Sequence, residues 1–199
     1  MLNLPKDFDT LLKIDGWDDC ENPINGHKGN CIHIYRYENY AIKAVFKDRE
    51  NGLLHRDNLI QEANALKDLI HDNIIKSYGY FENDNMAWLV LDYIEDNLAG
   101  LKKLLNNEQK DKMYTEIKSA IKFIFEKGYC HLDINPNNVM ITKTFSPILI
   151  DFQVAKKIKQ TDTSFENSID YAQRIKVESC CGAFLSWSLI DFKKELYGY

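Results

Sequence analysis

One short segment of the sequence holds the side chains best suited to catalysis. It contains His131, Asp133 and Asn138 in the pattern H-x-D-x-x-x-x-N. The Asp133 carboxylate could accept a proton from a hydroxyl group, and the Asn138 amide oxygen could ligate magnesium. Further along, a short apolar stretch ends at Asp151, whose carboxylate could bridge a metal ion to phosphate groups. Together these residues indicate transfer of a phosphoryl group to a hydroxyl acceptor.

Phosphoryl transfer also needs a cation on the nucleotide phosphates, and Lys43 could supply it. Lys43 ends the apolar run Tyr40-Ala41-Ile42-Lys43, which is typical of a strand. Glu62 lies in a predicted helix, on the apolar stripe marked by Leu59 and Leu66. A buried carboxylate requires a partner, and we expect that partner to be Lys43. For these two residues alone, a surface lysine and an unrelated surface glutamate would explain the sequence equally well.

The elements expected to carry these residues change in character along the chain. The first half predicts a hairpin over 31–46, a helix over 56–70 and a strand over 86–93. The second half predicts helices over 98–105, 113–125 and 177–196, and a short strand over 147–150. Gly128 would end the helix 113–125. The sequence therefore predicts one α+β domain over 1–199, with a strand-rich lobe (about 1–95) and a mainly helical lobe (about 96–199).

Composition excludes several other classes of protein. The 199 residues carry a net charge of -5, which argues against a nucleic-acid-binding protein. No apolar run approaches the length of a membrane span, so we expect no membrane contact and a cytoplasmic location. We also expect a monomer. The number of cysteines is odd, and the sequence contains no C-x-x-C motif. This indicates reduced thiols without a structural zinc site. They are Cys20, Cys31, Cys130, Cys180 and Cys181.

Taken in order, these motifs resemble the protein-kinase superfamily over most of residues 26–152. The motifs are Tyr40-Ala-Ile-Lys43, Glu62, His71-Asp-Asn-Ile-Ile-Lys76, Leu91-Asp92-Tyr93-Ile94, the His131 segment and Asp151-Phe152. The resemblance implies a bilobal kinase fold that uses ATP and Mg²⁺. It also implies that Lys43 contacts the α and β phosphates and that Glu62 holds Lys43. Asp133 would be the catalytic base, and Asn138 and Asp151 would ligate magnesium.

The same resemblance implies how the nucleotide is bound. The backbone around Asp92 to Ile94 would hydrogen-bond the adenine, and Leu91 would be the gatekeeper beside it. Only Gly26-His27-Lys28-Gly29 remains of a glycine-rich phosphate loop, and an ordinary turn explains that pattern nearly as well. The nucleotide-binding residues implied, besides Lys43 and the two magnesium ligands, are Gly26, Gly29, Ala41, Leu91, Asp92 and Ile94.

The sequence also departs from the kinase pattern. Leu132 replaces the arginine that pairs with a phosphorylated activation loop, Asn135 replaces a lysine, and Gln153 replaces the glycine after Asp151-Phe152. No A-P-E motif follows, and the chain after Asp151 is short. These features resemble the minimal kinases injected by bacterial type III secretion, such as the OspG/NleH and HopBF groups. They imply an enzyme that is active by default or switched by a partner.

Three classes of function stay open from the sequence. The first is a serine/threonine protein kinase, acting on a host protein such as an Hsp90-class chaperone, or activated by a ubiquitin-conjugating enzyme. Such an enzyme could be secreted into the cytosol of a host cell. The second is a small-molecule phosphotransferase of the aminoglycoside type, which shares the H-x-D-x-x-x-x-N pattern. The third is a pseudokinase that serves only as a binding module.

Overall fold

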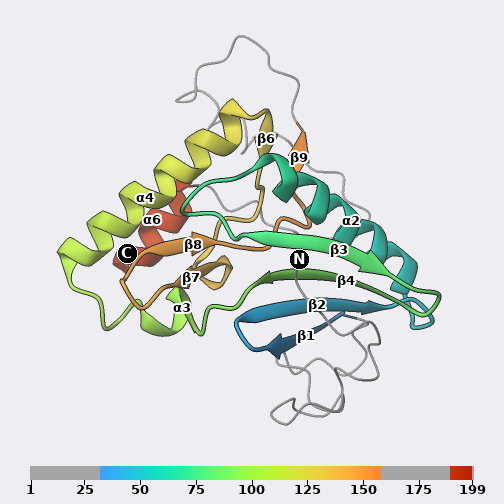
Figure 1. The fold of residues 1–199 in the computed structure, drawn as a ribbon. Helices are drawn as coiled ribbons and strands as arrows, with labels where there is room; N and C mark the ends of the chain where they lie inside the picture. The colour runs from blue at the N-terminus through green and yellow to red at the C-terminus, as the bar shows by residue number, and fades with distance from the viewer. Residues whose placement is uncertain (1–31, 158–188, 199) are drawn as a thin grey trace. The chain divides into compact units, whose positions relative to one another are not determined.

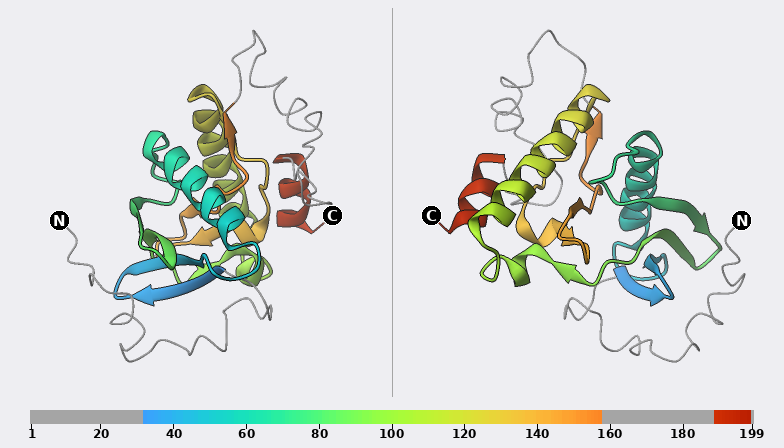
Figure 2. Two further views of the ribbon diagram at one scale, coloured as in Figure 1. Left: turned by 90° about the vertical axis from the view of Figure 1, so that its right-hand side faces the viewer. Right: turned by 60° about the vertical axis from the view of Figure 1, so that its left-hand side comes forward.

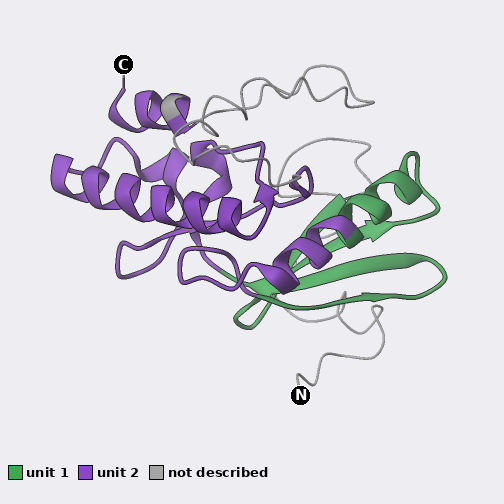
Figure 3. Ribbon diagram, turned by 90° about the horizontal axis from the view of Figure 1, so that it is seen from above, with its two compact units in different colours: residues 1–60, 77–93 green, residues 61–76, 94–199 purple. Residues whose placement is uncertain are grey.

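The computed structural model describes residues 32–157 and 189–198. The chain divides into two compact units, shown in Figure 3: residues 1–60 with 77–93, and residues 61–76 with 94–199. The domain boundary expected near residue 95 stays a prediction. Figures 1 and 2 follow the elements along the chain. In order they are β1 (Ile32–Tyr37), β2 (Tyr40–Phe46), α2 (Gly52–Asp68), β3 (Ser77–Glu82), β4 (Met86–Asp92), β5 (Asp96–Asn97), α3 (Leu98–Leu101), α4 (Asn107–Glu126), β6 (Tyr129–Cys130), the 3₁₀ helix η1 (Pro136–Asn138), β7 (Val139–Ile141), β8 (Pro147–Leu149), β9 (Lys156–Lys157) and α6 (Leu189–Tyr197).

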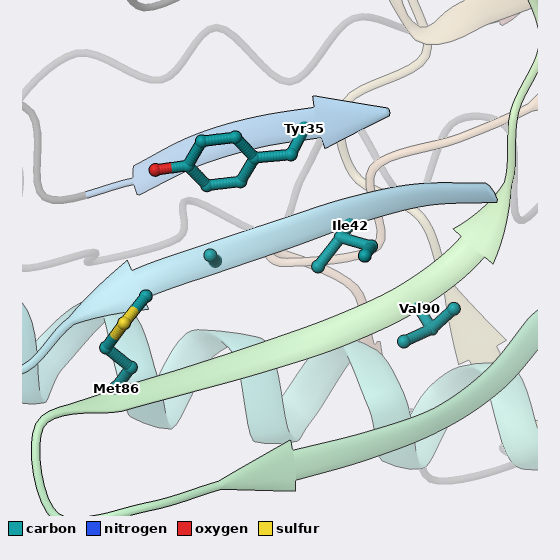
Figure 4. Packing of buried hydrophobic residues seen from close by; sticks show 5 residues of the cluster. Tyr35, Ile42, Met86 and Val90 are labelled. Carbon is teal, nitrogen blue, oxygen red and sulfur yellow. The ribbon is translucent and has the colours of Figure 1, made fainter. Parts of the chain in front are cut away.

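A four-stranded antiparallel sheet forms the first unit, in the order β1-β2-β4-β3. The expected hairpin and the expected strand over 86–93 are confirmed by β1, β2 and β4. One face of the sheet carries an apolar cluster, and Figure 4 shows Tyr35, Ile42, Met86 and Val90 within it. Because side chains alternate along a strand, the residue that follows Ile42 points to the opposite face. The cluster therefore fixes which face of β2 carries Lys43.

Helix α2 begins earlier than predicted and ends earlier too. Its first turn exposes Leu53 and Leu54, so the buried stripe used for the prediction gives no sign of this turn. Gly52 is needed at the start, because a Cβ there would lie 2.3 Å from the backbone oxygen of Phe46. The helix ends at Asp68, and Ile70, placed in the predicted helix, is 83% exposed beyond it.

Among the described residues, α4 is the longest helix of the second unit. Asn106 caps its first turn: its side chain accepts from the Gln109 backbone N–H, and the Gln109 side chain accepts from the Asn106 N–H. The predicted end is confirmed, because Gly128 follows the helix with φ 76°. The buried stripe of α4 consists of Met113, Ile117, Ala120 and Ile124.

Helix α3 is shorter than the predicted helix over 98–105. It ends at Leu101, and the chain then turns before the cap of α4. Leu104, expected on the apolar stripe, is 79% exposed, whereas Leu98 and Leu105 are buried. The prediction was wrong here because the leucines have helical spacing although the helix ends at Leu101. The sequence pattern does not show that the chain turns there to begin α4.

The described part of the C-terminal segment confirms a helix that packs on α4. Phe192 of α6 is fully buried, and Glu195 pairs with Lys102 at 2.7 Å. The Tyr197 hydroxyl donates to the Asp111 carboxylate. The start of the predicted helix, 177–188, lies outside the described residues.

The expected α+β class is confirmed by the antiparallel sheet of the first unit and the mainly helical second unit. The second unit also contains two small sheets, β5-β7-β8 and β6-β9. None of the helices described is long and apolar enough to cross a membrane.

Candidate active site

The loop between β6 and η1 orients the Asp133 carboxylate. Its two oxygens accept hydrogen bonds from two amide groups: Asn135 Nδ2 at 2.9 Å and Asn138 Nδ2 at 2.7 Å. Asn138 Nδ2 also donates to the Asp133 backbone oxygen at 2.9 Å. The residue just before Asp133, Leu132, has a left-handed backbone with φ 69°, which is uncommon for a side chain of this kind. Backbone strain of this type is concentrated at functional sites.

His131 connects this loop to the end of β8. Its Nε2 donates to the Ile150 carbonyl oxygen at 3.0 Å, because a carbonyl can only accept. Its Nδ1 accepts from the Asp133 backbone N–H at 3.3 Å. The ring is buried and packs edge-on against Phe152 at 4.6 Å. Burial lowers the pKa of His131 despite the opposing effects of the Ile150 carbonyl, Asp151 and Asp133. A neutral imidazole is the form that both hydrogen bonds require.

Asn138 and Asp151 are brought together by β7 and β8. The Ile150 backbone N–H donates to the Asn138 carbonyl at 2.9 Å, so the residue after Ile150 begins beside Asn138. Asp151 itself has φ 65°, a second left-handed residue other than glycine near Asp133. The structure therefore places three predicted site residues, Asp133, Asn138 and Asp151, in one part of the second unit.

Glu62 also belongs to this unit, and its side chain is completely buried in α2. Its Oε1 accepts from the Phe152 backbone N–H at 3.0 Å, a contact that the sequence did not predict. The predicted partner, Lys43, belongs to the first unit. The pairing of Lys43 with Glu62 stays a prediction.

Lys43 lies on β2 with only 7% of its surface exposed. In the antiparallel register, Lys43 pairs with Leu89, and Ala41 pairs with Leu91. Directly opposed residues share a face of the sheet, so Lys43, Ala41 and Leu91 lie on the face opposite the Ile42 cluster. Desolvation, with a smaller effect of the Lys43 charge, lowers the pKa of His55 in the same unit.

The segment expected to bind adenine is anchored within the first unit as far as Tyr93. Asp92 accepts a hydrogen bond from the Tyr78 hydroxyl at 2.6 Å, and this bond is the main reason that the pKa of Tyr78 rises to about 12. The Tyr93 N–H donates to the Asn39 carbonyl at 2.8 Å. Ile94 is half-buried and begins the next stretch of the second unit. Gly26 and Gly29 lie outside the described residues.

Comparison with known proteins identifies the family to which the chain belongs. A family model described as "Protein kinase domain" matches residues 25–175, more than half of the chain. The chain belongs to the protein kinase family. This confirms the superfamily resemblance and, at the level of the family, the expected enzyme class. The narrower resemblance to injected effector kinases stays a prediction.

Similar proteins with curated names are also kinases. Serine/threonine-protein kinase RUNKEL of Arabidopsis thaliana is 28% identical over 70% of this chain and 10% of its own length. Serine/threonine-protein kinase D of Synechocystis sp. is 35% identical over 49% of this chain and 20% of its own length. The probable serine/threonine-protein kinase PknB of Lactococcus lactis is 24% identical over 71% of this chain and 24% of its own length. The chain thus spans a quarter or less of these three relatives.

The residues of this candidate site fit a magnesium ion. Asn138 uses its amide nitrogen for both of its bonds to Asp133, so its amide oxygen is not needed for them. That oxygen and the Asp151 carboxylate are the hard donors that Mg²⁺ prefers, with phosphate and water completing the coordination. Within residues 32–157 and 189–198, no three or more His, Cys, Asp or Glu side chains form a metal-binding group.

Two residues that support the candidate site carry no clear signal in the sequence. Asn135 was interpreted only as a lost lysine charge, yet its amide holds one oxygen of Asp133. Gln61 was not singled out at all, yet it donates to two backbone carbonyls beyond Asp151. For Asn135 the spacing of two residues from Asp133 was an available signal. Gln61 has no such signal, because its partners lie far away in the sequence.

Proposed function

We propose that this chain is an ATP- and magnesium-dependent protein kinase that phosphorylates serine or threonine hydroxyls. The observation that carries the proposal is the group of Asp133, Asn138 and Asp151. Two amides orient the Asp133 carboxylate, and Asn138 is joined through the backbone to the residue before Asp151. A carboxylate held in this way can take the proton of an attacking hydroxyl. The names of the relatives support serine and threonine as acceptors.

In this proposal each predicted residue has a defined part. The Asp133 carboxylate accepts the hydroxyl proton while the substrate oxygen bonds to the γ-phosphorus and the bond to the ADP oxygen breaks. Asn138 and Asp151 hold magnesium, which when bound offsets the negative charge of the phosphates. Lys43 contacts the α and β phosphates, and Glu62 holds Lys43.

The adenine-binding part of the proposal uses residues of β2 and β4. Ala41 and Leu91 supply an apolar surface on the Lys43 face of the sheet. The backbone from Asp92 to Ile94 hydrogen-bonds the adenine edge. Gly26 and Gly29, outside the described residues, belong to the proposal as phosphate contacts on the sequence resemblance alone.

We further propose that the enzyme is active without loop phosphorylation and acts on a protein of a host cell. Leu132 supports activity without loop phosphorylation, because it offers a loop phosphate no cation. Asn135 and Gln153 support the action on a host protein, because they resemble the OspG group of injected effector kinases. An Hsp90-class chaperone is the proposed substrate. A ubiquitin-conjugating enzyme as activating partner is the alternative.

The first experiment measures nucleotide binding through thermal unfolding. ATP should raise the unfolding temperature clearly when magnesium is present and much less when it is absent, because Asn138 and Asp151 can reach phosphate only through a cation. Equal stabilisation under both conditions would exclude the proposed metal ligands.

The second experiment identifies the acceptor. The protein is incubated with labelled ATP and either purified Hsp90-class chaperone, host lysate or an aminoglycoside, with and without a ubiquitin-conjugating enzyme. Label on serine or threonine, absent with Asp133→Ala, supports the proposal. Label on the aminoglycoside alone would support a small-molecule phosphotransferase, and binding of ATP without any transfer would support a pseudokinase.

A further inference from the structure

Two neighbouring residues of α2 bond the backbone that follows Asp151. Glu62 Oε1 accepts from the Phe152 N–H at 3.0 Å. Gln61 Nε2 donates to the carbonyl oxygens of Gln153 at 3.2 Å and of Ala155 at 2.5 Å. All of these residues belong to the second unit. Three hydrogen bonds from one turn of helix therefore fix the segment 152–155.

Gln61 acts in this contact only as a hydrogen-bond donor, through its side-chain amide nitrogen. Both partners are carbonyl oxygens, which can only accept, and an amide nitrogen carries two hydrogens. The amide oxygen in the same place would repel both carbonyls. The Gln61 side chain is largely exposed, so it adds little to the core of α2. Its contribution is to the segment after Asp151.

That segment needs external support. Asp151 has a left-handed backbone that is strained for a residue with a Cβ. After it, the chain forms a turn closed by the Ala155 N–H, which donates to the Phe152 carbonyl at 3.1 Å. Phe152 and Ala155 are both buried. Bonds that fix this turn also oppose relaxation of the strained residue before it.

We propose that Gln61 is a positioning residue that acts through this turn. By holding the carbonyls of Gln153 and Ala155, it keeps Asp151 in the orientation that a magnesium ligand needs. It does so in a chain whose Leu132 provides no cation for a loop phosphate. The role of Asp151 in this inference rests on the proposed kinase function, whereas the holding of the turn does not.

Four proteins test the inference: the full chain as it stands and the variants Gln61→Met, Gln61→Lys and Asn64→Met. Methionine matches glutamine in length and helix propensity but donates no hydrogen bond. Lysine donates up to three bonds and should restore the contact. Asn64 lies on the exposed side of α2 one turn later, where its amide oxygen accepts a hydrogen bond from Lys67. It is therefore the matched control.

Amide hydrogen exchange of residues 151–157, measured without nucleotide, gives the first readout. Gln61→Met should speed exchange of the Phe152 and Ala155 amides roughly tenfold, because two hydrogen bonds that hold the turn are lost. Gln61→Lys and Asn64→Met should exchange like the unmodified chain. Unchanged exchange in Gln61→Met, or equal acceleration in Asn64→Met, would overturn the inference.

The second readout is the dependence of ATP binding on magnesium. It is measured as the magnesium concentration that gives half of the maximal rise in unfolding temperature caused by ATP. Gln61→Met should raise it roughly tenfold, as changes in groups that support metal ligands commonly do, and Gln61→Lys should restore it. Faster exchange with unchanged magnesium dependence would overturn the positioning role. If the unmodified chain itself bound no ATP with magnesium, the proposed function would fail together with the role of Asp151. The exchange result would still decide whether Gln61 holds the turn.

Discussion

The proposed function gives Asp133 and Asp151 different roles, and the two residues have different surroundings in the structure. The Asp133 carboxylate is held by two side-chain amides, as expected for a group that must face an acceptor hydroxyl. Asp151 follows Ile150, whose N–H donates to the Asn138 carbonyl, and has a left-handed backbone, so it lies beside the other proposed metal ligand. The two roles can therefore be separated by mutation.

Asp133→Ala should lower turnover by about 10²–10⁴-fold, the usual contribution of a general base, and leave ATP binding with magnesium nearly intact. Asp151→Ala should weaken both, because it removes a metal ligand. Single-turnover rates and thermal shift with ATP and magnesium measure the two effects separately. If both variants bound ATP equally well, the division of roles would be wrong.

His131 should make stability depend on pH. Its pKa in the folded chain is lowered by burial from the ordinary value of 6.5. When the pH falls below 6.5, His131 takes up a proton in the unfolded chain but stays neutral in the folded chain. The free energy of unfolding therefore decreases as pH falls. One such group contributes at most about 1.4 kcal/mol per pH unit.

His131→Phe keeps an aromatic ring beside Phe152 but cannot titrate. It should be less stable at neutral pH, since both hydrogen bonds of the imidazole are lost, and its stability should fall less steeply on acidification. Denaturant unfolding at about pH 7.5 and 5.5 measures the two slopes. His55, whose pKa is also lowered, is present in both proteins and cancels in the comparison. Equal slopes would contradict this account of His131.

At the scale of elements, α6 shows how an amphipathic segment supports the helical unit. Its buried face packs on α4, and its polar residues bond to the same unit through Lys102 and Asp111. Helix α4 leads through Gly128 and β6 into the loop of Asp133. Loss of the α6 contact should therefore weaken the unit that carries the catalytic loop.

Phe192→Ala should lower the free energy of unfolding by about 3–5 kcal/mol, because a fully buried aromatic ring is removed. Leu104→Ala is the control, since Leu104 is exposed and should change stability by less than about 0.5 kcal/mol. Urea unfolding of the full chain measures both. A small effect of Phe192→Ala would mean that α6 contributes little to the core and is better explained as a docking face.

The sequence predicted elements well where a buried stripe or a stop residue marked them. The apolar stripe of α4 and Gly128 predicted most of that helix and its end, and apolar runs predicted β2 and β4. The exposed first turn of α2 and the short α3 were missed, because neither obeys a simple apolar period. The predicted site residues come from local motifs, whereas Gln61 acts on carbonyls beyond Asp151, and such long-range hydrogen bonds leave no local pattern.

At the scale of the whole molecule, the proposed function draws on both compact units. Lys43 and most of the residues proposed to bind adenine belong to the first, and Asp133, Asn138 and Asp151 belong to the second. The hydrogen bonds that fix the site residues of the second unit all come from within that unit. Side-chain amides orient Asp133, and Gln61 and Glu62 hold the segment after Asp151. None of these bonds involves a phosphorylated residue.

The enzyme should therefore keep its activity after treatment with a phosphatase. In a kinase activated through its loop, a phosphate pairs with a cation beside the catalytic aspartate, and removal of the phosphate releases the loop. Here the residue beside Asp133 is Leu132, a buried apolar side chain that offers a phosphate no hydrogen bond or charge. Initial rates before and after treatment should agree within about twofold. A loop-activated kinase treated in parallel should lose most of its activity, and a comparable loss here would show that a phosphorylated residue supports the active state.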